Sequence, residues 1–172
     1  MAVSDLIPLL LIIIALIGAA FQISREGNRI SHAERAGILL SWAFLIIIGF
    51  GGIWGFIGHT LFADRVALSI GWPPGNPFQQ EVALTNLALG VLGLLSFRIA
   101  GSFRVATIIA YTIFMIGAGI GHIWQIFSAG NMAVNNAGLL LWIDLLVPPA
   151  IIILYLVQHT MHLQETRPSL AR

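Results

Sequence analysis

Five apolar runs divide the chain, and each is long enough to cross a lipid bilayer as a helix; they lie at about residues 5–23, 37–62, 77–97, 104–127 and 137–158. A helix needs about 20 residues to cross the hydrocarbon core, where only helices and closed barrels satisfy their backbone groups. With 58% hydrophobic and only 9% charged residues, the chain is too apolar for a soluble domain. The sequence therefore predicts an all-α, polytopic membrane helix bundle, a single transmembrane domain over residues 1–172.

The segments between these runs alternate in arginine content, which predicts their orientation. Arginines gather after the first, third and fifth runs, whereas one follows the second and none follows the fourth: Arg25, Arg29, Arg35, Arg98, Arg104, Arg167 and Arg172, against Arg65. Cytoplasmic loops carry the excess of basic residues. We therefore expect the N-terminus outside, the C-terminus in the cytoplasm, and the plasma membrane as the location.

Two missing residue types exclude several chemistries. The chain has no cysteine, which excludes disulfides, thiolate zinc sites, iron–sulfur clusters and thiol nucleophiles. It has no lysine either, which excludes Schiff-base chemistry. The net charge of +1 leaves no basic patch for nucleic acid, so the lipid bilayer is the expected partner.

The connection at residues 64–76 is expected to lie over the outer end of the bundle. Its first half alternates apolar residues that suit an interfacial segment, and residues 71–75 read Gly-Trp-Pro-Pro-Gly, a turn. Asn76 then predicts a helix start, with Pro77 at the first helical position and Gln79 completing a capping box.

Four ionisable side chains on four different runs should lie at one depth near the outer surface: His59, Glu81, His122 and Asp144. At about 1.5 Å of rise per residue, they fall within about one helical turn of each other along the membrane normal. Ionisable groups inside a membrane are costly and usually mark a function. This shared depth indicates a polar site facing outward.

Two imidazoles and two carboxylates form a nitrogen and oxygen ligand set suited to zinc, iron, manganese or copper. The sequence therefore favours a metal site made by the four residues, with supporting contacts from Asp64, Gln125 and Thr85. Asn86 lies about 140° around the helix from Glu81, so we expect the two not to serve the same centre.

Glycines flank both histidines of the expected site. Gly52 and Gly55 share a stripe with His59, and residues 117, 119 and 121 thin the surface beside His122. Such faces permit close helix packing, room for a ligand, or contact with a second copy or a partner in a membrane complex. Pro148 also removes the helical donor for the carbonyl of Asp144, which predicts a kink and a polar cavity there.

Four functions stay open at this point. The favoured one is metal binding, by an enzyme that activates water or oxygen or by a site that holds or passes the ion. The second is a b-type cytochrome in which His59 and His122 are the axial ligands of one haem. The third is a proton-coupled carrier, and the fourth an accessory subunit of a larger membrane complex.

Three stretches carry a resemblance to a known group of proteins. They are residues 56–64 (FIGHTLFAD), residues 71–81 (GWPPGNPFQQE) and residues 121–125 (GHIWQ). Together they resemble an uncharacterised bacterial family of small polytopic membrane proteins with a domain of unknown function. The resemblance covers the second to fifth runs and implies a bacterial inner membrane, without implying an activity. The chain is also faintly similar to the small DoxX-like membrane folds.

Overall fold

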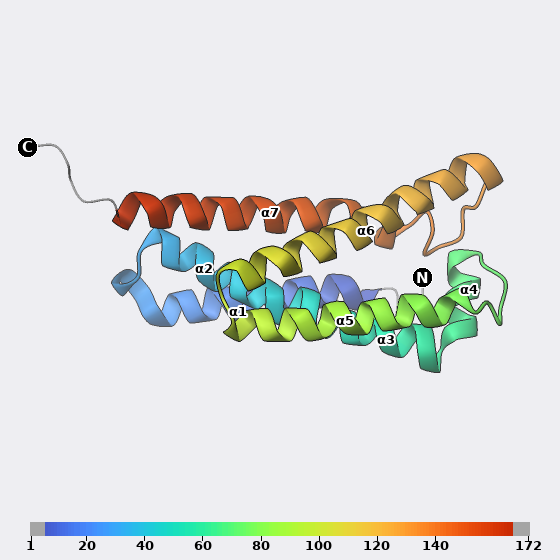
Figure 1. The fold of residues 1–172 in the computed structure, drawn as a ribbon, viewed down its shortest axis with the longest axis horizontal. Helices are drawn as coiled ribbons and strands as arrows, with labels where there is room; N and C mark the ends of the chain where they lie inside the picture. Colours follow the sequence, from blue (N-terminus) through green and yellow to red (C-terminus); the bar gives the residue numbers. More distant parts are fainter. Residues whose placement is uncertain (1–5, 167–172) are drawn as a thin grey trace, which may run out of the picture.

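The computed structural model describes residues 6–166 as a bundle of helices (Figure 1). Residue 5, where the first predicted run begins, lies outside these described residues, as do Arg167 and Arg172. The elements are α1 (Ile7–Glu26), a 3₁₀ turn (Gly27–Arg29), α2 (His32–Trp42), a π-helical segment (Ala43–Phe50), α3 (Gly51–Leu61), α4 (Ala63–Ile70), α5 (Phe78–Arg98), α6 (Ser102–Ala129) and α7 (Leu139–Thr166).

Five of the resulting rods are long and apolar enough to cross a membrane, which confirms the predicted number of spans: Ile7–Arg29, His32–Leu61, Phe78–Arg98, Ser102–Ala129 and Leu139–Thr166. The chain is a multi-pass membrane protein. The second rod starts earlier than predicted because Ser31 and Glu34 form a reciprocal capping box. The last rod continues through Pro148 and on to Thr166.

The start of α5 follows the prediction only in part. The side chain of Asn76 accepts a hydrogen bond from the amide of Phe78 at 2.9 Å, as expected of a helix-starting asparagine. Gln79, however, is buried and its side chain pairs with the ring of His59. The side chain of Gln79 therefore does not close a capping box with Asn76, because its Oε1 atom pairs with His59 instead.

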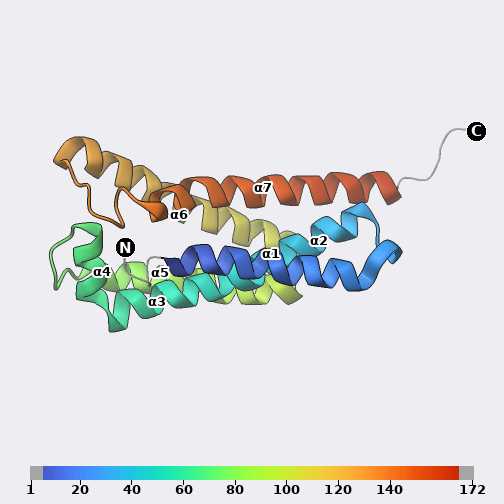
Figure 2. The same cartoon turned by 180° about the vertical axis from the view of Figure 1, so that it is seen from behind.

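The rods form two groups that separate toward one end of the bundle (Figures 1 and 2). One group is α6 with α7, and the other is α1, α3 and α5, with α2 packing against α7 at the far end. The short helix α4 and the α6–α7 connection close the end where the groups separate (Figure 1). We call α4 with residues 71–76 and 130–138 the cap.

The π-helical segment and α3 cross α5 at backbone contact. A Cβ added to Gly52 would lie 2.6 Å from the backbone nitrogen of Gly90, and one added to Gly93 would lie 2.5 Å from that of Gly49. Only glycine permits helices to approach so closely. The predicted small-residue face of the second run is thus a packing face against α5, and it fixes one wall of the bundle.

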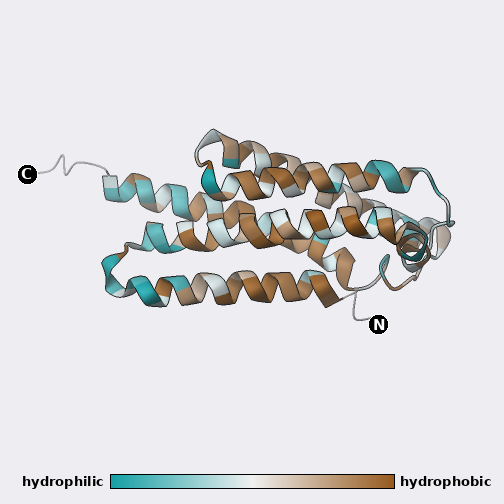
Figure 3. Cartoon of the chain, turned by 90° about the horizontal axis from the view of Figure 1, so that it is seen from below, coloured by the Kyte–Doolittle hydropathy of each residue, from teal (hydrophilic) through white to brown (hydrophobic). Residues whose placement is uncertain are grey.

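Polar residues concentrate at the two ends of the bundle, with apolar surface between them (Figure 3). The turns that join α1 to α2 and α5 to α6 share one end, and they carry most of the arginines: Arg25, Arg29, Arg35, Arg98 and Arg104. Arg65 lies at the other end, in α4. This asymmetry agrees with the predicted orientation, which stays a prediction.

Candidate functional site

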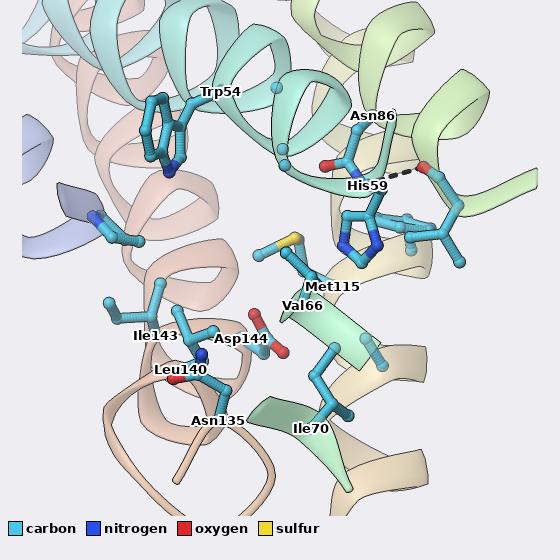
Figure 4. Close-up of a pocket in the computed structure, with 18 of the residues that line it drawn as sticks. Trp54, His59, Val66, Ile70, Asn86, Met115, Asn135, Leu140, Ile143 and Asp144 are labelled. Carbon is cyan, nitrogen blue, oxygen red and sulfur yellow. Dashed lines mark hydrogen bonds between the residues drawn. The ribbon is translucent and has the colours of Figure 1, made fainter. Parts of the chain in front are cut away.

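A cavity of about 1130 Å³ lies between the two helix groups, and we call it the central cavity. Its walls come from α1, the π-helical segment, α3 and α5 on one side and from α6 and α7 on the other, with α4 at its end. The lining is mainly apolar, with a few polar side chains among the hydrophobic ones (Figure 4). Such a surface is typical of small-molecule sites, which usually measure about 300–1,000 Å³.

His122 and Asp144 face each other in the wall made by α6 and α7. Nε2 of the ring lies 3.6 Å from Oδ2 of the carboxylate, and each side chain is 11% exposed. Both residues line the central cavity, and Figure 4 shows the carboxyl of Asp144 pointing into it. The structure thus brings together two of the four residues that the sequence selected.

Asn136, which is fully buried, fixes the proton on the other ring nitrogen of His122. Its side-chain nitrogen donates to the carbonyl of Asn131 at 2.7 Å and, more weakly, to that of His122 at 3.4 Å. Its Oδ1 is therefore the acceptor, so Nδ1–H of His122 donates to it at 2.8 Å. Nε2 is left to face Asp144.

This arrangement makes the His122–Asp144 pair electrically neutral. If Nε2 carried a lone pair and the carboxyl were ionised, two electron-rich atoms would face each other with no proton between them. In an apolar setting such a charge is costly unless it is paired. One proton is therefore held by the pair, and the net charge is zero whether it sits on the nitrogen or on the oxygen.

The opposite wall carries the second histidine. His59, near the end of α3, points into the central cavity (Figure 4), and its Nδ1 pairs with Oε1 of the buried Gln79. Asn86 donates its side-chain NH₂ to the carbonyl of Val82 at 2.9 Å. A Cβ at Gly55 would lie 2.6 Å from Oδ1 of Asn86, so this glycine makes room for the asparagine.

Hydrogen bonds hold the cap across the end of the cavity. The amide of Asn135 donates to the carbonyl of Ser69 at 2.9 Å, and the side chain of Asn131 donates to the carbonyl of Ile70 at 2.8 Å. Trp72 donates its indole N–H to Gln125 on α6 at 3.0 Å. These bonds tie α4 to the α6–α7 side of the bundle; that this end faces outward stays a prediction.

The remaining predicted site residues fall into two classes. Gln125 lines the cavity and receives hydrogen bonds from the cap. Glu81 is exposed on α5, Thr85 donates to the backbone of its own helix, and Asp64 accepts the amide of Gly75 at 2.8 Å. None of these three lines the cavity. Asn86 does line the cavity, so α5 turns Asn86 and not the predicted Glu81 toward it.

The predicted four-residue metal set is therefore not assembled. Within residues 6–166, no three His, Cys, Asp or Glu side chains gather as a group that could hold a metal ion. The physical reason is helix rotation: α5 turns Glu81 away from the cavity, and the two histidines stand in different walls. Of the predicted ligands, His122 and Asp144 remain in contact.

The glycines of α6 divide between packing and open space. A Cβ at Gly119 would lie 2.7 Å from the side chain of Leu145, so this glycine packs α6 against α7. At Gly117 and Gly121 an added Cβ would meet nothing within 4 Å, and both residues line the central cavity. Gly119 therefore serves helix packing, whereas Gly117 and Gly121 leave open space in the cavity.

Several residues of the site escaped the sequence argument. Asn136 sits in a short polar run of the α6–α7 connection, and its run of asparagines is the only signal that could have found it. Trp54 lines the cavity but looks like an ordinary membrane aromatic in the sequence. Nothing in the sequence predicted that Gln79 is buried, because its position after Asn76 indicated a helix-capping role.

Comparison with known proteins places the chain in a family. No curated protein and no solved structure matches the chain. The bacterial setting and the faint DoxX likeness stay predictions. One family model, described as a family of unknown function (DUF6790), matches residues 5–164 and so spans nearly all of the chain. The protein belongs to this uncharacterised family, as the resemblance of its motifs predicted.

Proposed function

We propose that the protein binds a lipophilic small molecule inside the membrane, with the ligand's polar head group held by hydrogen bonds in the central cavity. The cavity supports this because it combines a large volume, about 1130 Å³, with a mainly apolar lining. Its few polar groups come from both walls, so one molecule between α3 and α6 can contact both. A site of this kind recognises an amphiphile by shape and by a few hydrogen bonds.

The observation that carries the proposal is the side chain of Tyr111. This residue is only 6% exposed and lines the central cavity. No hydrogen bond joins its hydroxyl to another residue within 6–166, and the oxygen keeps some access to the cavity. The hydroxyl is thus available to a bound molecule that carries a hydroxyl or carbonyl group.

An organic ligand also suits the site better than the metal first favoured. A metal ion needs three or four ligand atoms at short range. Here Nδ1 of His122 is engaged by Asn136, its Nε2 faces Asp144, and Glu81 lies outside the cavity. A lipophilic ligand requires only the pair, the tyrosine hydroxyl and the apolar walls.

Haem binding is the second candidate, and one observation favours it. His59 and His122 line the same cavity from opposite walls, as two axial ligands would. The ring of His122 would have to give up its contact with Asp144 to bind iron through Nε2. An absorption spectrum of the purified protein separates the two candidates, because a bis-histidine haem has sharp visible bands.

The test fills the cavity without disturbing the helices. Gly121→Leu places a side chain into open cavity space, whereas Gly37→Leu changes a helical glycine that does not line the cavity. Each protein is purified in mild detergent, extracted with organic solvent, and the extract is compared by mass spectrometry. We expect one lipophilic compound at near-stoichiometric amount with wild type and Gly37→Leu, and at least tenfold less with Gly121→Leu.

The proposal fails if all three proteins yield the same mixture of bulk lipids in the same amounts. Unfolding of Gly121→Leu would confuse the comparison, so circular dichroism spectra of the three proteins are recorded alongside. Should Gly121→Leu lose its helical signal, Gly117→Leu takes its place, since this position is equally open to the cavity.

A further inference from the structure

We infer that the central cavity selects amphiphiles with an uncharged head group, a hydroxyl or carbonyl, and that His122 excludes cationic amphiphiles by neutralising Asp144. This inference rests on the proposed function and names the chemical class of its ligand. A lone carboxylate in an apolar cavity would attract an ammonium group. When the carboxyl lies beside a fixed imidazole, the pair has no net charge that could attract an ammonium group.

The neutralising contact is built into the fold. Asn136 is 0% exposed and is held by the carbonyl of Asn131, so it cannot turn its amide without losing that bond. It accepts the Nδ1–H of His122, which leaves Nε2 directed at Asp144. The ring therefore has one orientation. Its Nδ1 is protonated whether the other proton of the pair sits on Nε2 or on Asp144.

Three further polar groups around the cavity are neutral hydrogen-bonding groups. Tyr111 offers a hydroxyl, Trp54 an indole N–H, and Asn86 the Oδ1 atom whose companion NH₂ is already bound to Val82. Figure 4 shows Trp54 and Asn86 at the same cavity as Asp144. Donors and acceptors of this kind match a hydroxyl or a carbonyl and provide no counter-charge for an ion.

The remaining titratable groups near the cavity do not change this balance. Arg65 lines the cavity but its side chain is exposed, and its guanidinium lies over the ring of Phe62. Water screens such a charge. His59 is paired with the neutral Gln79, while Glu81 and Asp64 do not line the cavity. An ion in the cavity would thus lose its hydration without a buried partner.

Three probes with one chain length test the selection: dodecan-1-ol, dodecylamine and dodecanoate, near neutral pH. The protein is reconstituted in lipid nanodiscs, and each probe is titrated at equal membrane mole fraction. The readout is the emission of Trp54, which lines the cavity, with Trp54→Phe as the blank for the other tryptophans. We expect dodecan-1-ol to bind at least about tenfold more tightly than either ion.

Two matched variants separate the charge of the pair from its shape. His122→Gln keeps a polar side chain but removes the imidazole, so the ammonium of dodecylamine becomes the partner that can pair with an ionised Asp144. Preference should then shift at least about tenfold toward dodecylamine. Asp144→Asn keeps the shape without a charge, so the alcohol should remain preferred. The double variant, His122→Gln with Asp144→Asn, should behave like Asp144→Asn alone. Its residue 144 has no carboxylate that the loss of the imidazole could leave unpaired.

The outcomes separate a failure of the proposed function from a failure of the inferred ligand class. If no probe changes the emission of Trp54, or if Gly121→Leu leaves the changes intact, the proposed function itself fails. If probes bind but wild type prefers the amine or the carboxylate, the cavity exists as a site and the inferred ligand class is wrong. If wild type and a folded His122→Gln variant show the same preference among the three probes, the role of His122 is overturned. If that variant does not fold, the order of affinities of the three probes for wild type decides alone.

Discussion

Replacing Gly52 by alanine tests the helix crossing that holds one wall of the central cavity. The new Cβ would lie 2.6 Å from the carbonyl oxygen of Asn86 and 2.6 Å from the nitrogen of Gly90. Both are backbone atoms, so no side chain can swing aside. Ordinary contact begins at 3.4 Å, so α3 and α5 must separate by about 0.8 Å at this point.

The expected loss follows from a comparison with a second glycine. Gly121→Ala adds the same methyl group to a helix, where it meets nothing within 4 Å. The intrinsic preference of helices for alanine over glycine, about 1 kcal/mol, is common to both variants and cancels in the difference. What remains is the cost of overpacking, about 1–3 kcal/mol. Gly52→Ala should therefore be less stable than Gly121→Ala by about that amount.

Both proteins would be unfolded by titrating a denaturing detergent into mild-detergent micelles, with helicity followed by circular dichroism. The free energy of unfolding of each variant is compared with that of wild type at the same micelle composition. If Gly52→Ala and Gly121→Ala differ by less than about 0.5 kcal/mol, the backbone contact between α3 and α5 does not exist as described.

Three further predictions concern other parts of the bundle. Asn136→Leu should lower the free energy of unfolding by about 2 kcal/mol or more in the same titration, because it leaves Nδ1–H of His122 without its acceptor. Arg104→Lys should lose about 1–2 kcal/mol, because one ammonium cannot replace a guanidinium that bonds two helices at 2.9 Å and 3.0 Å. In this cysteine-free chain, Gln80→Cys should react with an impermeant maleimide on intact cells, and Ala100→Cys only after permeabilisation.

Each of these has a result that would contradict it. Wild-type stability of the leucine variant would mean that the buried amide is dispensable, and full retention by the lysine variant would mean that charge alone matters at Arg104. Labelling of Ala100→Cys in intact cells, without labelling of Gln80→Cys, would reverse the orientation derived from the arginines.

The spans were predictable because the membrane imposes a length on each apolar run. That length is a property of the sequence alone, and the five runs reappear as five rods with shifts at their ends. The shifts have local causes, such as the capping box at Ser31, or tertiary ones, such as the burial of Gln79 against His59. The helix of the last run continues past its predicted end to Thr166.

Depth along the membrane normal was readable from the sequence, but the direction of each side chain was not. His122 and Asp144 lie at similar depth and do meet, at 3.6 Å. Glu81, predicted at the same depth, faces away from the cavity. Rotation of a helix about its axis depends on which face packs best against its neighbours, and here the backbone contact at Gly52 and Gly90 sets the rotation of α5.

The sequence by itself determined the membrane class, the number of spans and the family, since apolar length and local motifs require no knowledge of neighbours. Only the tertiary structure decided that Asn136 orients His122, that Tyr111 opens onto a cavity, and that the small residues of α6 serve both packing and open space. These features depend on how far apart two helix groups stand. Glycine contacts fix α3 against α5 within one group, and the cap bridges that group to α6, so no single segment encodes the distance.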